Sequence, residues 1–567
     1  MPTINSFVLL MLLATACGGY TPPLVDVTEV REPKINPPVQ GSGIIDRVSI
    51  KMPATPCLPV PENIPVIPES TRPIWAKEMA KLISAGRKAP QHNLTSQSGA
   101  ASWQPLTEDE IRDPSELKRV IVARLGGTMI DGHVLDSCQP FAATIYTYMV
   151  DGKPNLGIPL TDEQLLDDGF YTAREAATGE KILMKMIMPT DVSPNPRVTE
   201  AQVLKVCFDD VIGQRACAFV LVPNTPGPHP LAVAFHQSQN QWGALETMGA
   251  IPYNHMSMTY GQELAGRGYV VVMPIQNGYG ELFEANQGAT EWNTLRLARI
   301  RLAFPNASLV LTEFWQSRRA VDAVLSFKNV LNIASDNYAV MGHSKGGYNA
   351  VVMGALDPRV KSTFANGGRL SYPMKGLDGD DNATELTGTA QRGMVYSWCE
   401  WSGYITDTCF YEDTPDEYPL DANVFFPLLV GPGKSFIVGL IEDDRLPGEV
   451  VMDENNQVTR SRWLSMRRLG EELKRVAILR GGIGYTGIVW SGFREAWGIP
   501  YLAANEGDLV ALRKFTVNQN VGGRTHGLYR TVGIPAAAIM DALMFGDLAL
   551  NPNAYASEVH LSNGGRY

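Results

Sequence analysis

The stretch "YAVMGHSKGGY" (Tyr338–Tyr348) places a serine between two glycines at the end of an apolar run. Its centre, "GHSKG" (342–346), fits the pattern Gly-x-Ser-x-Gly, and the small residues that follow are typical of a helix. A sharp turn from a buried strand into a helix holds such a serine above the carboxyl edge of a sheet. The stretch therefore predicts that Ser344 is a nucleophile. The alternative is a structural glycine turn.

Strand-like and helix-like segments alternate around this stretch. Continuous apolar runs of the buried-strand type recur, and the segment 313–329 has apolar residues at helical spacing. Strands alternating with helices predict an α/β fold with a mostly parallel, doubly wound sheet and helices on both faces. The predicted strands besides 338–343 are "HPLAVAFHQ" (229–237), "YVVVMPI" (269–275), "RVKSTFANGG" (359–368) and "KSFIVGLIEDD" (434–444).

The N-terminus has the pattern of an export signal. "FVLLMLLATAC" (Phe7–Cys17) is too short to span a bilayer as a mature helix and fits the apolar core of a signal peptide. It also resembles a bacterial lipobox, in which Cys17 would carry the lipid. We therefore expect an exported protein, either secreted or a periplasmic, outer-membrane or cell-surface lipoprotein, that contacts membrane only through this anchor.

The cysteine count agrees with export. The chain has seven cysteines, and six remain if Cys17 is lipidated or removed. Two of them flank "FDDVIGQRA" (208–216), which reads as a hairpin, and another two bracket a short loop. Buried free thiols in a cytosolic protein are the alternative. Of the possible connectivities we predict sequential pairing, which gives Cys57–Cys138, Cys207–Cys217 and Cys399–Cys409.

Composition divides the chain into four parts. A Pro-rich stretch without periodicity follows the signal and is typical of a tether or of an extended segment lying on the surface. Short amphipathic pieces after it predict a small helical region. The predicted parts are a signal peptide with lipobox (1–17), a tether (18–75), a small N-terminal region (76–165) and the α/β domain (166–567), with a cap insertion at 373–419 and a long insertion at about 448–520.

Charge and ligand patterns exclude several function classes. The 567 residues carry a net charge of −11 and no basic cluster, which argues against binding of nucleic acid or anionic lipid. No His or Cys cluster suggests zinc, and the acidic loop "DGDDN" (378–382) lacks the glycine of an EF-hand. We therefore expect neither metal nor cofactor. The pattern leaves the oligomeric state open.

A serine alone is a poor nucleophile, so a base and an acid must accompany it. In α/β-hydrolases they follow in the order Ser, Asp or Glu, His. Of the two histidines after Ser344, His526 lies in a glycine-flanked loop and His560 in a polar tail, so we predict His526 as the base. Asp443 follows a buried strand and is the predicted acid, with Asp444 as the alternative.

The transition state also needs N–H donors for the oxyanion. The first is the N–H of Lys345, directly after the nucleophile. The second should come from the loop after the strand "LAVAFH" (231–236), here His236-Gln237-Ser238, where we choose the N–H of Ser238 and keep Gln237 as the alternative.

Residues 221–368 resemble the α/β-hydrolase superfamily, in particular its branch of dienelactone hydrolases and acetyl xylan esterases. The likeness lies in "PHPLAVAFHQ", "YGQELAGRGYVVVMPIQNGYGE" and the segment around "GHSKGGYNAVVMGALDPRV". It implies an α/β-hydrolase fold and hydrolysis of carboxylic esters, including acyl esters of carbohydrates. Ser344 would then be the nucleophile, Asp443 the acid and His526 the base. The substrate would be a small-molecule or glycan ester.

Two other functions stay open at this point. A serine peptidase of the prolyl-oligopeptidase type also has Gly-x-Ser-x-Gly-Gly-Tyr at its nucleophile, but that family carries a β-propeller and residues 1–165 show no blade repeats. The second is a non-catalytic, glycan-binding surface lipoprotein. Aromatic residues in the cap 373–419 fit contacts with a sugar or acyl group and equally fit a small core of the cap itself.

Overall fold

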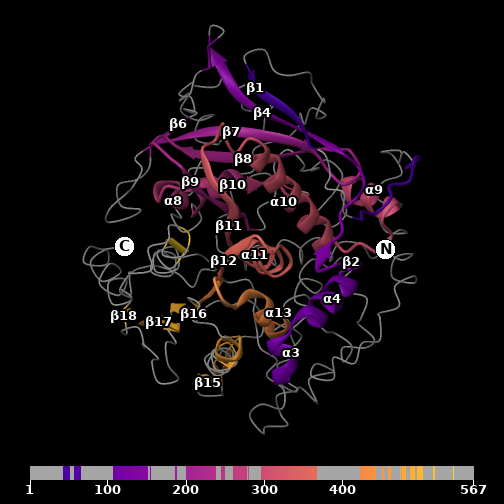
Figure 1. Ribbon diagram of the computed structural model, residues 1–567. Coiled ribbons are helices and arrows are strands. Elements are labelled where there is room, and N and C mark those ends of the chain that lie inside the picture. Colours follow the sequence, from indigo (N-terminus) through magenta and orange to yellow (C-terminus); the bar gives the residue numbers. More distant parts are fainter. Residues whose placement is uncertain are drawn as a thin grey trace, which may run out of the picture.

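A computed structural model of the chain describes its main sheet and the helices packed on it (Figure 1). The described residues are 42–50, 56–64, 106–150, 153–154, 185–187, 200–237, 244–248, 260–277, 279, 295–366, 422–441, 450–452, 458–461, 473, 475–480, 486–491, 495–501, 515–516, 540–541 and 544.

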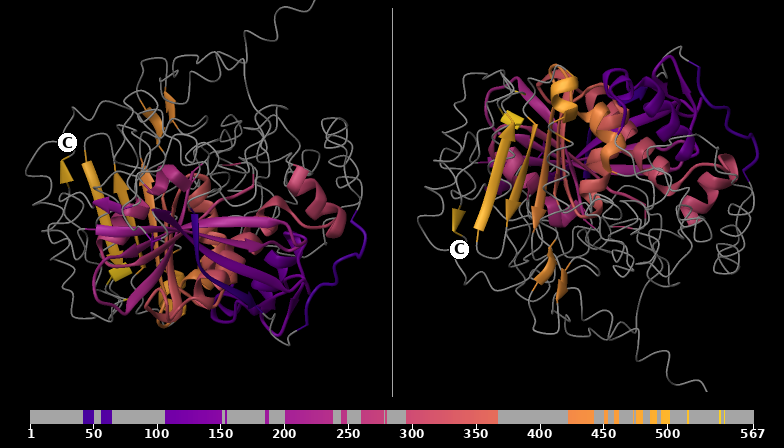
Figure 2. Two further views of the ribbon diagram at one scale, coloured as in Figure 1. Left: turned by 90° about the horizontal axis from the view of Figure 1, so that it is seen from above. Right: turned by 90° about the horizontal axis from the view of Figure 1, so that it is seen from below.

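The described strands form one 14-stranded sheet in the order β1-β4-β7-β8-β10-β9-β11-β12-β13-β16-β17-β18, with β5 beside β4 and β6 beside β7. From β10 to β16 in this order the neighbours run parallel, and the strands outside this run pair antiparallel. Figure 2 shows the twist of the sheet from β1 and β4 to β16 and β17.

The strands of this sheet have the following bounds: β1 Ser42–Ile50, β4 Phe141–Val150, β5 Lys153–Pro154, β6 Lys185–Ile187, β7 Glu200–Asp209, β8 Arg215–Pro223, β9 His229–Phe235, β10 Val270–Pro274, β11 Ile333–His343, β12 Val360–Asn366, β13 Ser435–Ile441, β16 Thr486–Ser491, β17 Glu495–Tyr501 and β18 Phe515–Thr516. Two small sheets lie apart from it, one of β2 (Met129–Ile130) and β3 (His133–Val134), the other of β14 (Val450–Met452) and β15 (Val458–Ser461).

The parallel strands are apolar because both of their faces are covered. Every residue of β9 and β10 is buried, which explains the continuous apolar runs in their sequences. Along β9, Leu231 and Val233 belong to one apolar cluster, while Ala232 and Ala234 belong to another. Because successive side chains of a strand point to opposite faces, the two clusters lie on the two sides of the sheet.

Helices contribute to both clusters. The larger cluster contains residues of α4 (Ser115–Arg124), α10 (Leu309–Ser326), α11 (Lys345–Leu356) and α13 (Ala422–Leu429). The smaller contains residues of α7 (Ala244–Met248) and α8 (Tyr260–Gly266). The predicted large sheet with helices is confirmed, and its central strands from β10 to β16 are parallel, which is compatible with an α/β-hydrolase fold. The remaining helices are α3 (Glu108–Arg112) and α9 (Leu295–Ala303).

Segments assigned to a tether and a helical region contribute strands to the main sheet. β1 lies within the predicted tether 18–75 and pairs antiparallel with β4, which in turn pairs with β7. Residues 42–50 are therefore a strand of the sheet rather than tether. The N-terminal region contains the helices α3 and α4, one of them in a predicted amphipathic piece, and it also contributes the strand β4. The sequence did not indicate β1 for two reasons: prolines flank it, and its pairing partner lies far along the chain.

The long insertion predicted at about 448–520 also needs correction. Within it, β16 pairs parallel with β13, and β17 and β18 follow by antiparallel pairing. These residues extend the main sheet. A strand at the end of a sheet gives a weaker sequence signal because only part of it is buried on both faces.

Two of the three predicted disulfides are present in the described residues. Cys57 is bonded to Cys138, and Cys207 is bonded to Cys217. The second pair faces each other directly across the β7–β8 hairpin, as the sequence spacing predicts. Cys399, Cys409 and Cys17 lie outside the described residues.

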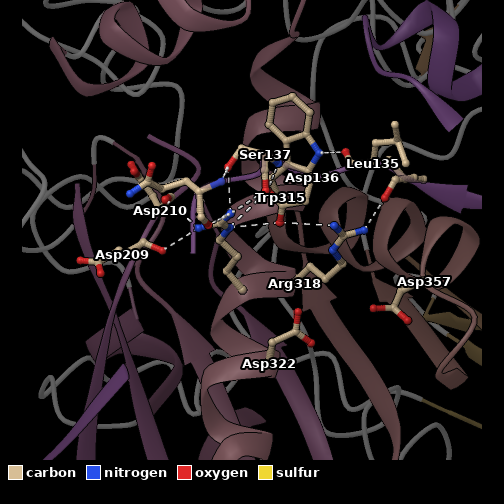
Figure 3. Close-up of polar contacts among 12 residues, drawn as sticks. Leu135, Asp136, Ser137, Asp209, Asp210, Trp315, Arg318, Asp322 and Asp357 are labelled. Carbon is tan, nitrogen blue, oxygen red and sulfur yellow. Dashed lines mark hydrogen bonds and ion pairs between the residues drawn. The ribbon is translucent and has the colours of Figure 1, made fainter. Parts of the chain in front are cut away.

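Arg319 of α10 joins the N-terminal region to the main domain. Its side chain is completely buried, and its Nε lies 3.1 Å from a carboxylate oxygen of Asp136. Its other nitrogens donate to Ser137 Oγ and to main-chain carbonyls of both regions, at Gln139, Asp209 and Asp210. We call these six residues the Arg319 cluster. Figure 3 shows Asp136, Ser137, Asp209 and Asp210 converging there, with Trp315 donating to the Leu135 carbonyl beside them.

Candidate active site

Ser344 has an unusual backbone conformation between β11 and α11. Its φ is 54° and its ψ is −121°. Within the described ranges, the non-glycine residues with positive φ are Asp131, Asn332 and Ser344. Asp and Asn adopt this conformation fairly often, whereas a serine there is strained. The sequence-based prediction of a strained turn at Ser344 agrees with this geometry.

The two flanking glycines are required by close backbone contacts. A Cβ atom at Gly342 would lie 2.0 Å from the carbonyl oxygen of Gly346. A Cβ atom at Gly346 would lie 2.0 Å from the carbonyl oxygen of Phe235 at the end of β9. Real Cβ atoms do not approach backbone so closely, so the turn admits only glycine at both positions. This is the physical content of the Gly-x-Ser-x-Gly pattern in this chain.

The turn also sets Ser344 apart in exposure. All residues from 338 to 357 are buried except Ser344, which is partly exposed. Its side chain makes no capping hydrogen bond to α11. Ser344 is thus the residue of this stretch that solvent can reach, and its side chain is not used as a cap of α11.

Asn366, at the end of β12, holds the turn from the neighbouring strand. The Ser344 N–H donates to the Asn366 carbonyl at 2.9 Å, and the Asn366 side-chain amide lies 2.8 Å from Nδ1 of His343. Sequence reasoning did not single out this residue. The available signal was its place at the carboxyl end of a predicted parallel strand, next to the nucleophile strand in the sheet.

The first predicted oxyanion donor, the N–H of Lys345, lies at the start of α11. Lys345 is the first residue of α11, a 12-residue helix, so its N–H lies at the positive end of the helix dipole. The close approach of Gly346 to Phe235 brings the loop after β9 against this first helical turn. Gln237, the alternative second donor, is buried in that loop. Ser238, the preferred second donor, lies outside the described residues.

His236, in the same loop, is completely buried and neutral. Burial lowers the pKa of its imidazole to about 3. A hydrogen bond to Gln237 acts to raise this pKa, and the charge of Lys345 acts to lower it. Its Nδ1 lies 2.8 Å from the Gln237 carbonyl. Since a carbonyl can only accept, Nδ1 carries the proton and donates. His236 therefore anchors the loop through this bond.

The strand that leads to the predicted acid reaches the correct edge. β13 runs parallel to β12, with Gly439 opposite Asn366, so its carboxyl end lies at the same edge as Ser344. Asp443 and Asp444 follow this strand but lie outside the described residues. The predicted base His526 and the alternative His560 also lie outside them. Of the three predicted triad residues, Ser344 is the one among the described residues, so the triad itself stays a prediction.

Two buried amide side chains follow β10 at this same edge. Gln276 is 1% exposed and Asn277 is 0% exposed. In the part of the chain that the structure describes, the side-chain N and O atoms of both have no hydrogen-bond partner. A buried amide without a partner is costly, so a polar group is expected beside them. Sequence reasoning did not identify either residue.

Two further searches cover only the described residues. Among them, no group of three or more His, Cys, Asp or Glu side chains is arranged to hold a metal ion. None of their helices has both the length and the apolar character needed to cross a bilayer.

Comparisons with known proteins find likeness only among solved structures, since no protein-family model and no curated protein matches the chain. A glucuronoyl esterase of carbohydrate esterase family 15 from Caldicellulosiruptor kristjansonii is 13% identical, with a TM-score of 0.34 over 64% of this chain and 81% of that one. A glucuronoyl esterase from Sporotrichum thermophile is 15% identical, with a TM-score of 0.33 over 60% and 82%. Acetyl xylan esterase 1 from a Thermoanaerobacterium species is 16% identical, with a TM-score of 0.27 over 51% and 81%. At these values, the function must be argued from the residues of this chain.

Proposed function

We propose that the protein is a serine hydrolase that cleaves carboxylic esters through an acyl-enzyme intermediate. The observation that carries this proposal is the conformation of Ser344. A strained, partly exposed serine lies between two glycines that no other residue can replace, at the start of a helix. Strain of this kind persists only where the surrounding structure enforces it, and it is typical of functional sites.

In the proposed reaction, Ser344 Oγ attacks the ester carbonyl carbon and gives its proton to the imidazole of His526. The carbonyl oxygen becomes an oxyanion that accepts hydrogen bonds from the N–H of Lys345 and from a second N–H in the loop after β9. The C–O bond to the leaving alcohol then breaks, and the imidazolium protonates that alcohol. Water attacks the acyl-enzyme by the same steps in reverse, releasing the acid and free Ser344. Asp443 orients the imidazole.

We further propose that the ester belongs to a hydroxyl-rich molecule such as a carbohydrate. Gln276 and Asn277 support this, because they place two amide side chains without a hydrogen-bond partner among the described residues at the carboxyl end of β10, close to the edge where Ser344 lies, and amides are suited to pair with hydroxyl groups. Export of the protein remains part of the proposal. Its support is the pair of disulfides, which persist in an oxidising compartment.

The test uses the mature chain with p-nitrophenyl acetate, acetylated sugars and a fluorophosphonate probe. We expect turnover of the ester and covalent labelling of Ser344, located by mass spectrometry of the labelled peptide. Ser344→Ala should lose roughly 10⁶-fold in kcat and all labelling. Full turnover by this variant would contradict the assignment of the nucleophile.

The same experiment separates the alternatives. Cleavage of aminoacyl-proline amides in preference to esters would favour the peptidase. A wild-type chain that binds glycan and stays unlabelled by the probe would favour the non-catalytic binding protein. Asn277→Leu sharpens the substrate class, since it should raise KM for acetylated sugars about 10-fold and leave KM for p-nitrophenyl acetate nearly unchanged.

A further inference from the structure

We propose that Lys345 is a positioning residue. It acts with Glu313, Tyr279 and His236 to keep the two N–H donors of the oxyanion site in the correct position relative to each other. This inference rests on the proposed function. The main chain of Lys345 supplies one donor, and its side chain makes contacts that lead to the loop expected to supply the other.

The first contact is a buried ion pair. Lys345 Nζ binds a carboxylate oxygen of Glu313 on α10, and the two side chains are 1% and 3% exposed. A buried ion pair contributes little net stability, because the desolvation of both charges offsets their attraction. Its presence directly after the nucleophile therefore points to a role other than stability. The pair fixes the Lys345 side chain on the side away from solvent.

The second contact joins Lys345 to an aromatic ring. Its Nζ lies 4.4 Å from the ring centroid of Tyr279, within the range of a cation–π interaction. Tyr279 is 0% exposed and follows β10. In a buried site such an interaction is stronger than at the surface, so the ammonium and the ring fix each other's position.

The third contact reaches the loop after β9. The rings of Tyr279 and His236 meet edge to face, with centroids 4.7 Å apart and an interplanar angle of 64°. Nδ1 of His236 donates to the carbonyl of Gln237 at 2.8 Å. The chain of contacts Glu313–Lys345–Tyr279–His236 therefore runs from α10, through the first residue of α11, to the peptide group of Gln237.

The backbone packing shows why the position of the loop after β9 relative to α11 matters. Gly346 leaves no room for a side chain against the carbonyls of Phe235 and His236, so α11 and the loop already touch at one point. The contacts through Tyr279 and His236 hold the same loop from a second side, through side chains, and so restrict its position further. Oxyanion donors must lie within a few tenths of an ångström of their places to stabilise the transition state.

The test compares Lys345→Met with the wild type. Methionine has a similar length and no charge, so it removes the ion pair and the cation–π contact while keeping most of the volume. We expect kcat for p-nitrophenyl acetate to fall roughly 10- to 100-fold and KM to stay within about twofold, because the oxyanion forms only in the transition state. The rate of fluorophosphonate labelling at Ser344 should fall by a similar factor.

Tyr338→Phe is the matched control. Tyr338 is buried in the middle of β11, and its hydroxyl donates to Asp357 at 2.8 Å. The control loses one buried polar contact of the nucleophile strand, so its thermal stability should drop while its kcat stays unchanged. If Lys345→Met does not fold, Tyr279→Leu interrupts the same chain of contacts and should show the same loss in kcat at unchanged KM.

The outcomes are distinct. A folded Lys345→Met or Tyr279→Leu variant with kcat within twofold of the wild type overturns the positioning role and leaves the proposed function intact. An equal loss of kcat in Tyr338→Phe also overturns it, because general destabilisation would then explain the effect. A wild-type chain that the probe does not label overturns the proposed function, and this inference with it.

Discussion

The region around Ser344 and the Arg319 cluster both contain buried charged side chains on or next to α10. They differ in that the donors of Arg319 all have hydrogen-bond partners, whereas the backbone at Ser344 is strained. Arg319 donates from all three of its nitrogens to a carboxylate, a hydroxyl and main-chain carbonyls. Around Ser344, in contrast, a non-glycine residue has positive φ, and two glycines touch backbone directly.

This difference separates stability from function. A guanidinium with satisfied donors joins the N-terminal region to the main sheet and leaves no group for a ligand. The disulfide Cys57–Cys138 reinforces the same place, since Leu58 donates to the Asp136 carbonyl at 2.8 Å. The Ser344 turn instead contains strain and exposes one hydroxyl, which costs stability and makes a nucleophile available. Three substitutions test this contrast.

The largest effect on stability is expected from Arg319→Met. It leaves the Asp136 carboxylate buried without its main partner, which typically costs about 3–5 kcal/mol of unfolding free energy. Denaturant unfolding measures the loss, and kcat of the protein that remains folded should stay within about twofold of the wild type. Lys328→Met removes a surface ion pair with Asp336 and should cost about 0.5 kcal/mol or less. Equal losses in the two variants would contradict a special role for the Arg319 cluster.

Gly346→Ala should act mainly on catalysis. The new Cβ would displace the Phe235 and His236 carbonyls, and so move the loop after β9 away from the first turn of α11. We expect kcat to fall about 100-fold, equivalent to about 2.7 kcal/mol of transition-state stabilisation. Steady-state kinetics with p-nitrophenyl acetate measures this.

Gly354→Ala controls for the glycine substitution on the same helix. Its Cβ would meet the side chains of Thr363 and Leu429 instead of the loop. This variant should lose stability and keep its kcat. A loss of kcat of the same size in both variants would show that α11 transmits any distortion, and that the contact at Gly346 is not specific.

Ser344→Gly should produce only a small change in stability, a gain of about 1 kcal/mol. Glycine adopts positive φ without the strain that serine carries there. Ser344→Ala keeps a Cβ and should leave the unfolding free energy unchanged, although both variants lose activity. Denaturant unfolding of the three proteins decides the point, and equal stability of the glycine and alanine variants would argue against strain at this residue.

Much of the central sheet could be predicted from the sequence. β9, β10, β11, β12 and β13 all occur where continuous apolar runs predict buried strands. The Cys207–Cys217 pairing also followed from local spacing, because the two residues face each other across one hairpin. These features depend on residues near each other in the chain, so their patterns are visible without a structure.

Other features depend on distant partners. β1 pairs with β4 about a hundred residues later, and its Pro-rich surroundings pointed to a tether. Glu313 and Tyr279 gave no sequence signal, because a buried glutamate or tyrosine is common outside functional sites. The signal at Asn366 was limited to its place at the end of a predicted strand. Their relation to Ser344 arises only when β10, β11, β12 and α10 pack together.

The sequence by itself determined that a serine stands at a sharp strand-to-helix turn, because the glycines at positions 342 and 346 and the apolar run before them are local requirements of that turn. The tertiary structure decided what surrounds this serine. It placed the end of β9 within contact of Gly346, and it buried the Lys345 side chain against Glu313 and Tyr279. Such contacts result from packing of segments far apart in the chain, and no local pattern specifies them.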